Sequence, residues 1–234
     1  MSHATTPLLR PATLADVPAL LAVKEALPMP AHDTRSGGFL LGASAERYHL
    51  LVTHGLARVL VDHGELVGFA IALPDPLLRA SELWQRRTQI AWDPDFDPDR
   101  IAAHPVAYFD QIAVLPRARA HAAALALRVL VELVLAGHRH VLTTTVVAPI
   151  KNLAALPFLA RVGARAVGHL AERYPDVGAI TSAIHHIDAD AFLPRLDAAL
   201  ADPSPALRRL VDLALPPELA SGIRDLEAPR RVRS

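Results

Sequence analysis

An arginine and a run of small side chains follow Pro116, directly after an apolar segment that ends at Leu115. Arg119 stands at the head of this run, and small residues continue to Ala124. A helix that starts here would direct unpaired backbone N–H groups and the positive end of its dipole towards one point. Small side chains let a ligand approach the backbone, and the arginine adds positive charge. The segment therefore predicts a phosphate-binding site at a helix N-terminus.

Two residues that can carry a proton, Tyr108 and Asp110, precede this segment. They belong to a strand predicted over residues 106–114, in which residues two apart face the same side. A carboxylate and a phenol on one face of a strand can act as general acid or base. Simpler interpretations remain open, in which Asp110 pairs with a basic neighbour and Tyr108 is a half-buried aromatic residue of the sheet.

An acidic segment is spaced like a calcium-binding loop, with alternating aspartates from Asp93 to Asp99. A calcium loop needs a glycine where this chain has Pro98, and a bidentate glutamate where it has His104. We therefore interpret the segment as a solvated acidic loop.

Two pairs of histidines have spacings that suit metal ligands. His138 and His140 form one pair, and His185 and His186 form the other. A structural metal site needs more ligands than one such pair provides, and the sequence suggests no third ligand for either. We therefore expect no metal site.

The composition limits the classes of function. The chain has 234 residues, of which 52% are hydrophobic, so it can bury a substantial core. Its 24 basic and 24 acidic side chains give no net charge, so neither nucleic acid nor an anionic membrane is an expected partner. The absence of cysteine excludes a disulfide scaffold, a thiolate zinc site and a cysteine nucleophile.

No segment of the sequence resembles a secretory signal or a membrane span. The first seven residues lack a basic region followed by an apolar core. The longest apolar run, residues 125–136, is interrupted by Arg128 and Glu132 and is too short to cross a bilayer. We therefore expect a cytoplasmic protein.

Hydrophobic periodicity and turn residues predict a mixed sheet with helices between its strands. The expected strands cover residues 8–12, 57–61, 66–73, 106–114, 141–147, 164–170 and 179–187. The expected helices cover residues 13–26, 45–54, 119–136 and 152–162. Residues 74–105 form an insertion between the third and fourth strands, with a helical centre at residues 77–88. Residues 1–187 thus form one domain, and residues 188–234 form a helical extension that packs on this domain or on a second copy in a homodimer.

The order of these elements resembles the GNAT superfamily of acyl-CoA N-acyltransferases. The family's signature is Gln or Arg, two residues, Gly, one residue, and Gly or Ala, after a strand and usually a proline. Here Arg119, Ala122 and Ala124 occupy these positions, three residues after Pro116. A second landmark of the family matches four residues in order and spacing, namely Asn152, Ala155, Phe158 and Gly163. The resemblance covers roughly residues 7–187 and implies an α/β (α+β) fold with a mixed, mostly antiparallel central sheet flanked by helices.

The resemblance implies acetyl-CoA as cosubstrate. The pyrophosphate would lie on the backbone N–H groups of Ala120, His121, Ala122, Ala123 and Ala124, beside Arg119. The pantetheine arm would pair with Ile112, Ala113 and Val114, and the Val114 N–H would face the thioester carbonyl. Asn152 and Phe158 would hold the far side of the arm. Three of these residues have simpler alternatives, because Arg119 and His121 can be solvated and Asn152 can cap its helix.

The activity implied is direct transfer of an acetyl group to an amine of a small molecule or peptide, without a covalent enzyme intermediate. Tyr108 and Asp110 lie near the family's catalytic carboxylate and would relay the proton of the amine. Two positions depart from the family, because Ala122 replaces a glycine and Leu159 replaces a tyrosine that can protonate the thiolate. These departures motivate an alternative, a catalytically inactive GNAT-like module for binding or regulation.

Overall fold

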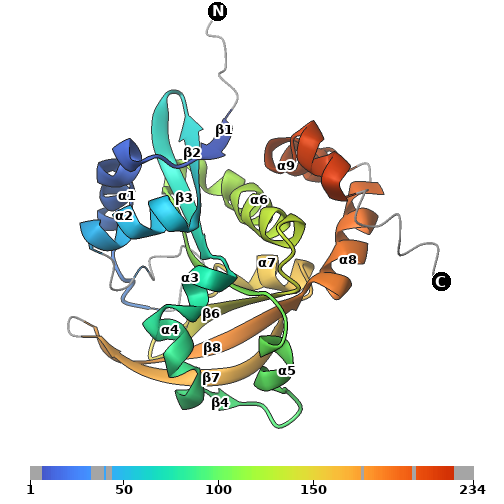
Figure 1. Ribbon diagram of the computed structural model, residues 1–234. Helices are drawn as coiled ribbons and strands as arrows, with labels where there is room; N and C mark the ends of the chain where they lie inside the picture. The colour runs from blue at the N-terminus through green and yellow to red at the C-terminus, as the bar shows by residue number, and fades with distance from the viewer. Residues whose placement is uncertain (1–6, 33–39, 41–43, 175–176, 202–203, 224–234) are drawn as a thin grey trace, which may run out of the picture.

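The computed structural model describes residues 7–32, 40, 44–174, 177–201 and 204–223 (Figure 1). Within these residues, eight strands form one mixed sheet in the order β1-β2-β3-β5-β6-β8-β7-β4. The strands are β1 (Leu8–Pro11), β2 (Leu56–Asp62), β3 (Glu65–Leu73), β4 (Ala91–Trp92), β5 (Val106–Val114), β6 (His140–Ala148), β7 (Arg165–Tyr174) and β8 (Gly178–Asp188). All neighbouring strands run antiparallel except β5 and β6. The predicted fold class is therefore confirmed.

Helices cover both faces of the sheet (Figure 1). They are α1 (Val17–Glu25), α2 (Ala45–His54), α3 (Asp75–Arg79), α4 (Glu82–Gln85), α5 (Pro98–Ala102), α6 (Ala122–Leu135), α7 (Leu156–Arg161), α8 (Ala189–Ala201) and α9 (Pro205–Ala214). Val59 and Leu60, which are adjacent on β2, are both fully buried but belong to different core clusters. The first cluster includes residues of α1, α2, α3 and α5, and the second includes residues of α6, α7 and α8.

The predicted hairpin between β2 and β3 has a tight turn. His63 and Gly64 both have positive φ, at 50° and 82°. Two such residues in a two-residue loop match the right-handed twist of the flanking strands. The hairpin leads β3 to the centre of the sheet, where it pairs with β5.

The insertion at residues 74–105 is more regular than predicted. Its expected helical centre consists of the two short helices α3 and α4, followed by a 3₁₀ turn over Arg86–Gln89. The strand β4 was not predicted, because two residues are too few to show a periodicity. This strand pairs with β7 and closes one edge of the sheet.

Two predicted helices begin later than the sequence indicated. Residues Pro116–His121 form a 3₁₀-helix, and α6 begins at Ala122 instead of Arg119. Likewise α7 begins at Leu156, because Asn152 lies in the preceding loop. Proline occupies the first turn of both segments, which suits a helix start because proline has no N–H to leave unpaired.

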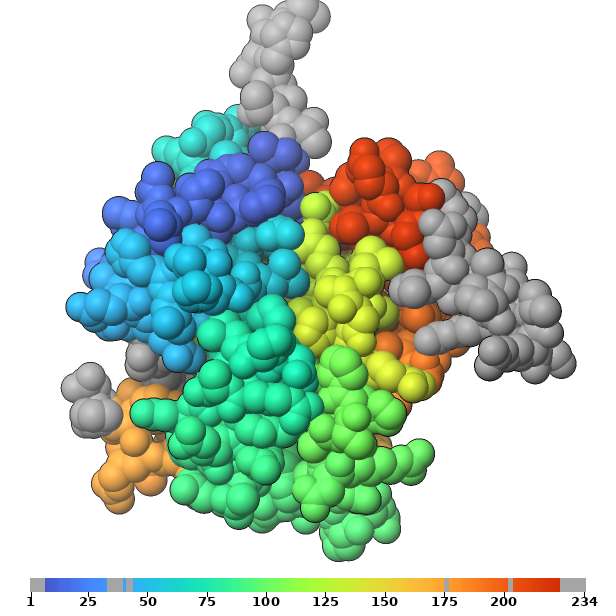
Figure 2. Space-filling model, viewed as in Figure 1, coloured from blue at the N-terminus to red at the C-terminus, as the bar shows by residue number. Residues whose placement is uncertain are grey.

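The helices after residue 188 pack on the domain of their own chain. Phe192, Leu193 and Leu196 of α8 are buried in the same cluster as α6, and Ala214 at the end of α9 is fully buried there. Figure 2 shows the red C-terminal segment in contact with the body of the molecule. Among the described helices, none combines the length and the apolar character that crossing a membrane requires.

Candidate active site

A fork between two central strands forms the candidate site. The parallel ladder of β5 and β6 runs from Val106 paired with His140 to Phe109 paired with Thr143, and it ends there although both strands continue. The diverging ends border a cavity of about 1080 Å³. Its volume is at the upper end of the range typical of pockets that bind small molecules and cofactors.

β-bulges account for the divergence. Ile71 of β3 pairs with Gln111 and Ala72 pairs with Phe109, so Asp110 is an extra residue without a partner across the ladder. A second irregularity interrupts β6 near its end, after Val146. Because a bulge bends its strand and re-aims the side chain next to it, β5 turns away from β6 and Asp110 is left at the cavity.

Asp110 is a half-buried carboxyl whose pKa is raised to about 6. Burial raises this pKa, whereas the charge of Arg47 and a hydrogen bond with Gln111 lower it. The Gln111 amide is itself held in place, because the hydroxyl of buried Tyr48 donates to its Oε1 at 2.8 Å. A carboxyl with this pKa is ionised at neutral pH and can accept a proton from a bound ligand.

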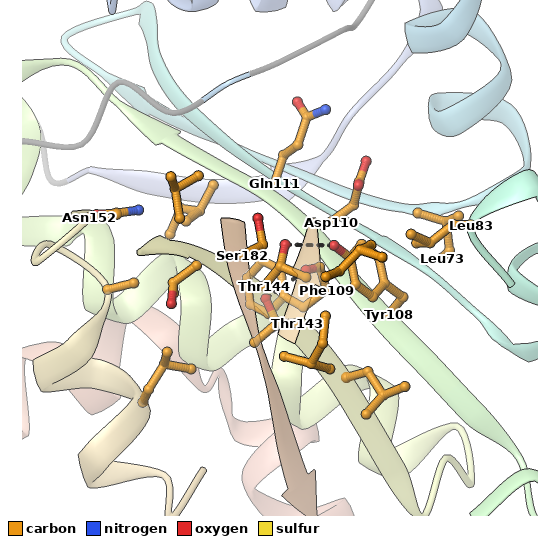
Figure 3. A pocket seen from close by; sticks show the side chains of 18 of the residues that line it. Leu73, Leu83, Tyr108, Phe109, Asp110, Gln111, Thr143, Thr144, Asn152 and Ser182 are labelled. Carbon is orange, nitrogen blue, oxygen red and sulfur yellow. Dashed lines mark hydrogen bonds between the residues drawn. The ribbon is translucent and has the colours of Figure 1, made fainter. Parts of the chain in front are cut away.

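Tyr108 borders the same cavity and stays protonated. Its hydroxyl lies 2.8 Å from Oγ1 of Thr144 on β6. Burial, and then the negative charge of Asp110, raise the pKa of this phenol above its usual value. Figure 3 shows Tyr108 and Asp110 on the right of the cavity, with Thr144 and Ser182 at its centre and Asn152 on the left. Of the two predicted proton carriers, Asp110 is ionised at neutral pH, whereas Tyr108 keeps its proton and is a weaker acid than a free tyrosine.

The end of β5 exposes backbone groups to the fork. The Leu115 N–H donates to the Val67 carbonyl oxygen at 2.8 Å. Because N–H groups along an antiparallel strand alternate in direction, the N–H groups of Ile112 and Val114 point away from β3, and that of Ala113 points towards it. Ile112 and Val114 line the cavity, and Ala113 is not among its lining residues. Contact of Ala113 with a coenzyme therefore stays a prediction, whereas Ile112 and Val114 border the cavity.

The start of α6 forms part of the cavity wall. Arg119, Ala122 and Ala123 line the cavity, whereas Ala120, His121 and Ala124 do not. Ala120 is exposed and Ala124 is buried in the core.

One predicted N–H donor is already used. The Ala122 N–H donates to the Arg119 carbonyl oxygen and closes the 3₁₀-helix. The sequence did not reveal this turn, because a 3₁₀ start and an α-helical start share the same residue preferences. Ala123 and Ala124 lie in the first turn of α6, which continues directly from this 3₁₀-helix.

The opposite wall of the cavity includes Asn152 and Phe158. The Asn152 N–H donates to the Val146 carbonyl oxygen, and its Oδ1 accepts from the Ala154 N–H at 3.0 Å. Asn152 therefore caps a turn at the end of β6 and does not cap α7, whose N-cap residue is Ala155. Phe158 is half-buried on α7, and its neighbour Leu159 also lines the cavity.

Several polar residues of the cavity were not predicted. Glu172 on β7 pairs with Arg86 at 3.0 Å and accepts from the Tyr174 hydroxyl at 3.3 Å. Burial, followed by the charge of Glu172, raises the pKa of Tyr174 to about 12. Arg47 and Thr144 also line the cavity. The only sequence signal was the run of threonines at residues 143–145, which is typical of a strand but does not indicate a site.

Trp84 of α4 also lines the cavity, with the guanidinium groups of Arg79 and Arg87 at 5.0 and 4.8 Å from its ring.

The acidic loop has a structural role in this fold. Asp97 caps α5, because its Oδ1 accepts from the N–H groups of Asp99 and Arg100. The cap gives this carboxylate two backbone donors. All four aspartates of the segment are exposed, as predicted for a solvated acidic loop, namely Asp93, Asp95, Asp97 and Asp99.

Comparison with known proteins identifies the fold. No protein-family model and no curated protein sequence matches the chain. Arabidopsis thaliana NAA60 in complex with a bisubstrate analogue is 19% identical with a TM-score of 0.56, covering 78% of this chain and 99% of that one. The ribosomal-protein-S18-alanine N-acetyltransferase of Escherichia coli is 15% identical with a TM-score of 0.54, covering 79% and 94%. A GNAT-family acetyltransferase of Streptococcus pneumoniae is 15% identical with a TM-score of 0.50, covering 77% and 98%.

Proposed function

We propose that this chain, which has the GNAT fold, transfers an acetyl group from acetyl-CoA directly to an amine in the cleft between β5 and β6. The observation that carries this proposal is the fork itself. Its two strands separate after Phe109 and Thr143 and leave backbone N–H groups beside a carboxyl of pKa about 6. Attack on a thioester places negative charge on its carbonyl oxygen, which N–H donors stabilise. An ammonium must first lose a proton to a base before its nitrogen can attack.

The coenzyme would lie along both walls of the fork. Its pantetheine arm follows the end of β5, where the N–H groups of Ile112 and Val114 are directed away from β3. Its pyrophosphate meets the guanidinium of Arg119 and the first-turn N–H groups of α6, since helix N-termini favour anions. Asn152 and Phe158 bound the arm on the opposite wall.

Asp110 is the proposed general base. It removes a proton from the acceptor ammonium, and the freed amine attacks the carbonyl carbon of the thioester. The negative charge that develops on the carbonyl oxygen is stabilised by the Val114 N–H, a type of contact whose removal costs about 2.7–4 kcal/mol of barrier. As the C–S bond breaks, the nitrogen of the intermediate loses its second proton to solvent, which leaves a neutral amide. The coenzyme thiolate takes a proton from solvent, because Leu159 has none to give. Tyr108, held by Thr144, gives this part of the cavity a polar wall.

The acceptor is an amine of a small molecule or a peptide. Structures similar to this chain include both kinds of enzyme, such as the ribosomal-protein-S18-alanine N-acetyltransferase and an agmatine N-acetyltransferase. The carboxylate of Asp110 borders the cavity and would attract a cationic ammonium group, whereas that of Glu172 is already paired with Arg86.

An activity measurement tests the proposal. The full chain is incubated with acetyl-CoA and a panel of polyamines, amino acids and short peptides, and release of the free coenzyme thiol is followed. We expect acceptor-dependent release by the wild type and a loss on the order of 10²-fold or more in Asp110→Asn. Asp99→Asn is the matched control, because Asp99 lies on α5 and does not line the cavity. Equal rates for wild type and Asp110→Asn would exclude Asp110 as the base.

Two observations favour a second candidate, a module that binds a coenzyme but does not transfer its acetyl group. The Ala122 N–H is used within the chain, and Leu159 cannot protonate a thiolate. Binding of acetyl-CoA without acceptor-dependent thiol release, across the whole panel, would support this module over the enzyme.

A further inference from the structure

A group of three metal-ligating side chains lies at one end of the sheet, outside the cavity. It consists of His140 on β6 and His186 and Asp188 on β8, all half-buried. Their ligand atoms lie within 4.8 Å of one another. The sheet register brings them together, because His140 pairs with Asp188 and the next residue on the same face, Leu142, pairs with His186.

The spacing of the two imidazoles suits one metal ion. Nδ1 of His140 lies 3.1 Å from Nε2 of His186. Two nitrogens bound to one tetrahedral zinc ion at its usual bond lengths lie about 3.3 Å apart, so a small ring movement suffices. We propose that His140, His186 and Asp188 bind a zinc ion, with water as the fourth ligand. Two histidines and one carboxylate with an open position form a ligand set that zinc accepts.

The surroundings hold the two rings in place. The ring of buried Phe96 lies 5.3 Å from that of His186, and the ring of His104 lies 5.6 Å from that of His140. The backbone near His104 is itself fixed, because the guanidinium of Arg79 donates to the carbonyl oxygens of Ala102 and His104. Rings that are held in this way lose little freedom when they bind an ion.

The carboxylate has an oxygen to offer. Oδ1 of Asp188 accepts from the Asp190 N–H at 2.7 Å, which orients the group and leaves Oδ2 for the metal. Two cations lie nearby, namely Arg139, which pairs with Asp190 at 2.7 Å, and Arg165, which lies across the ladder from His186. Carboxylates that bind metal ions are typically oriented by a further hydrogen bond of this kind.

The fold supplies the ligand that the sequence did not indicate. His140 and His186 come from the two different histidine pairs, and Asp188 completes the group. None of the three lines the cavity between β5 and β6, so this proposal stands apart from the proposed acetyl transfer. An ion here would link β6 to β8 next to the start of α8 and so stabilise this end of the sheet.

Titration of the full chain with zinc tests the site. Protein freed of metal with a chelator is titrated with zinc chloride by calorimetry, and the absorption spectrum of added Co²⁺ reports the coordination geometry. We expect one zinc ion per chain, a tetrahedral cobalt spectrum and a rise of Tm on zinc addition. His186→Gln and Asp188→Asn should each weaken zinc binding on the order of tenfold or more.

The chain has 12 histidines, so a control for adventitious binding is needed. His54→Gln changes an exposed histidine at the end of α2 and should bind zinc as the wild type does. Circular dichroism of the metal-free variants checks that each is folded. If His186→Gln or Asp188→Asn does not fold, His140→Gln replaces it as a ligand variant. Absence of zinc binding in the wild type, or equal affinities in wild type, His186→Gln and Asp188→Asn, would overturn the proposal.

Discussion

The hydroxyl of Thr143 donates to the carbonyl oxygen of Phe109 at 2.8 Å, at the last pair of the parallel ladder between β5 and β6. The next residue, Thr144, bonds through its hydroxyl to that of Tyr108. Two consecutive threonines of β6 thus hold two consecutive residues of β5 at the point where the strands separate. These contacts close the ladder and define the inner end of the cavity.

Removal of the hydrogen bond between Thr143 and Phe109 should destabilise the protein. Thr143→Val keeps the shape of the side chain but loses its hydrogen bond, so the free energy of unfolding should fall by about 1 kcal/mol. Urea denaturation measures this change. Thr53→Val is the control, because the Thr53 hydroxyl bonds a carbonyl oxygen within the exposed face of α2. Equal stabilities of the two variants would contradict the role of Thr143.

Asp110→Asn should lose activity and gain stability. Burial raises the folded-state pKa of this carboxyl to about 6, so the fold disfavours its ionised form. That penalty is fully present above about pH 6 and disappears as the pH falls towards the unfolded-state value of about 4. The variant should be more stable than the wild type by about 1–2 kcal/mol near pH 7 and equally stable near pH 4. A variant that is destabilised at both values would indicate a structural role for Asp110.

The rate of acetyl transfer should depend on the ionisation of Asp110. A general base works only when deprotonated, so kcat/KM should fall as the pH drops through about 6, the pKa of this carboxyl. A profile measured with two acceptors of different ammonium pKa separates the enzyme's ionisation from that of the acceptor. The lower limb should coincide for both acceptors, and a limb that moves with the acceptor would argue against an enzyme base of this pKa.

Arg119→Gln should weaken coenzyme binding. Arg119 lines the cavity at the start of α6, where its charge would meet the pyrophosphate. Charge-assisted hydrogen bonds contribute about 1.5–3 kcal/mol, so we expect affinity for coenzyme A to fall on the order of tenfold. Arg117→Gln is the matched control, since Arg117 is exposed, pairs with Glu65 and does not line the cavity. Equal losses in both variants would indicate a diffuse charge effect.

Long periodic elements could be predicted from the sequence. The continuous apolar runs of β3 and α6 reflect burial, which any chain of this pattern requires. The turn between β2 and β3 contains Gly64, and glycine is the residue that adopts positive φ most readily. These features depend only on residues that are close in the sequence, so they can be predicted without knowledge of the fold.

Features that depend on register could not be predicted. The bulge at Asp110 arises from the pairing of β5 with β3 and leaves no mark in the sequence of β5 itself. The 3₁₀ turn that uses the Ala122 N–H differs from an α-helical start only in which carbonyl accepts. The grouping of Asp188 with two distant histidines likewise needs the ladder between β6 and β8.

The measurement that tests the central claim most directly is a calorimetric titration of the wild type and two tryptophan variants with acetyl-CoA. Ala123 lines the cavity at the first turn of α6, so Ala123→Trp would fill the path of the coenzyme. Ala120 is exposed and lies outside the cavity, so Ala120→Trp serves as the control. We predict one molecule of acetyl-CoA bound per chain in the wild type and in Ala120→Trp, and loss of binding in Ala123→Trp. Absence of heat and of any thermal shift at millimolar acetyl-CoA, or equal binding by all three proteins, would contradict a coenzyme site between β5 and β6.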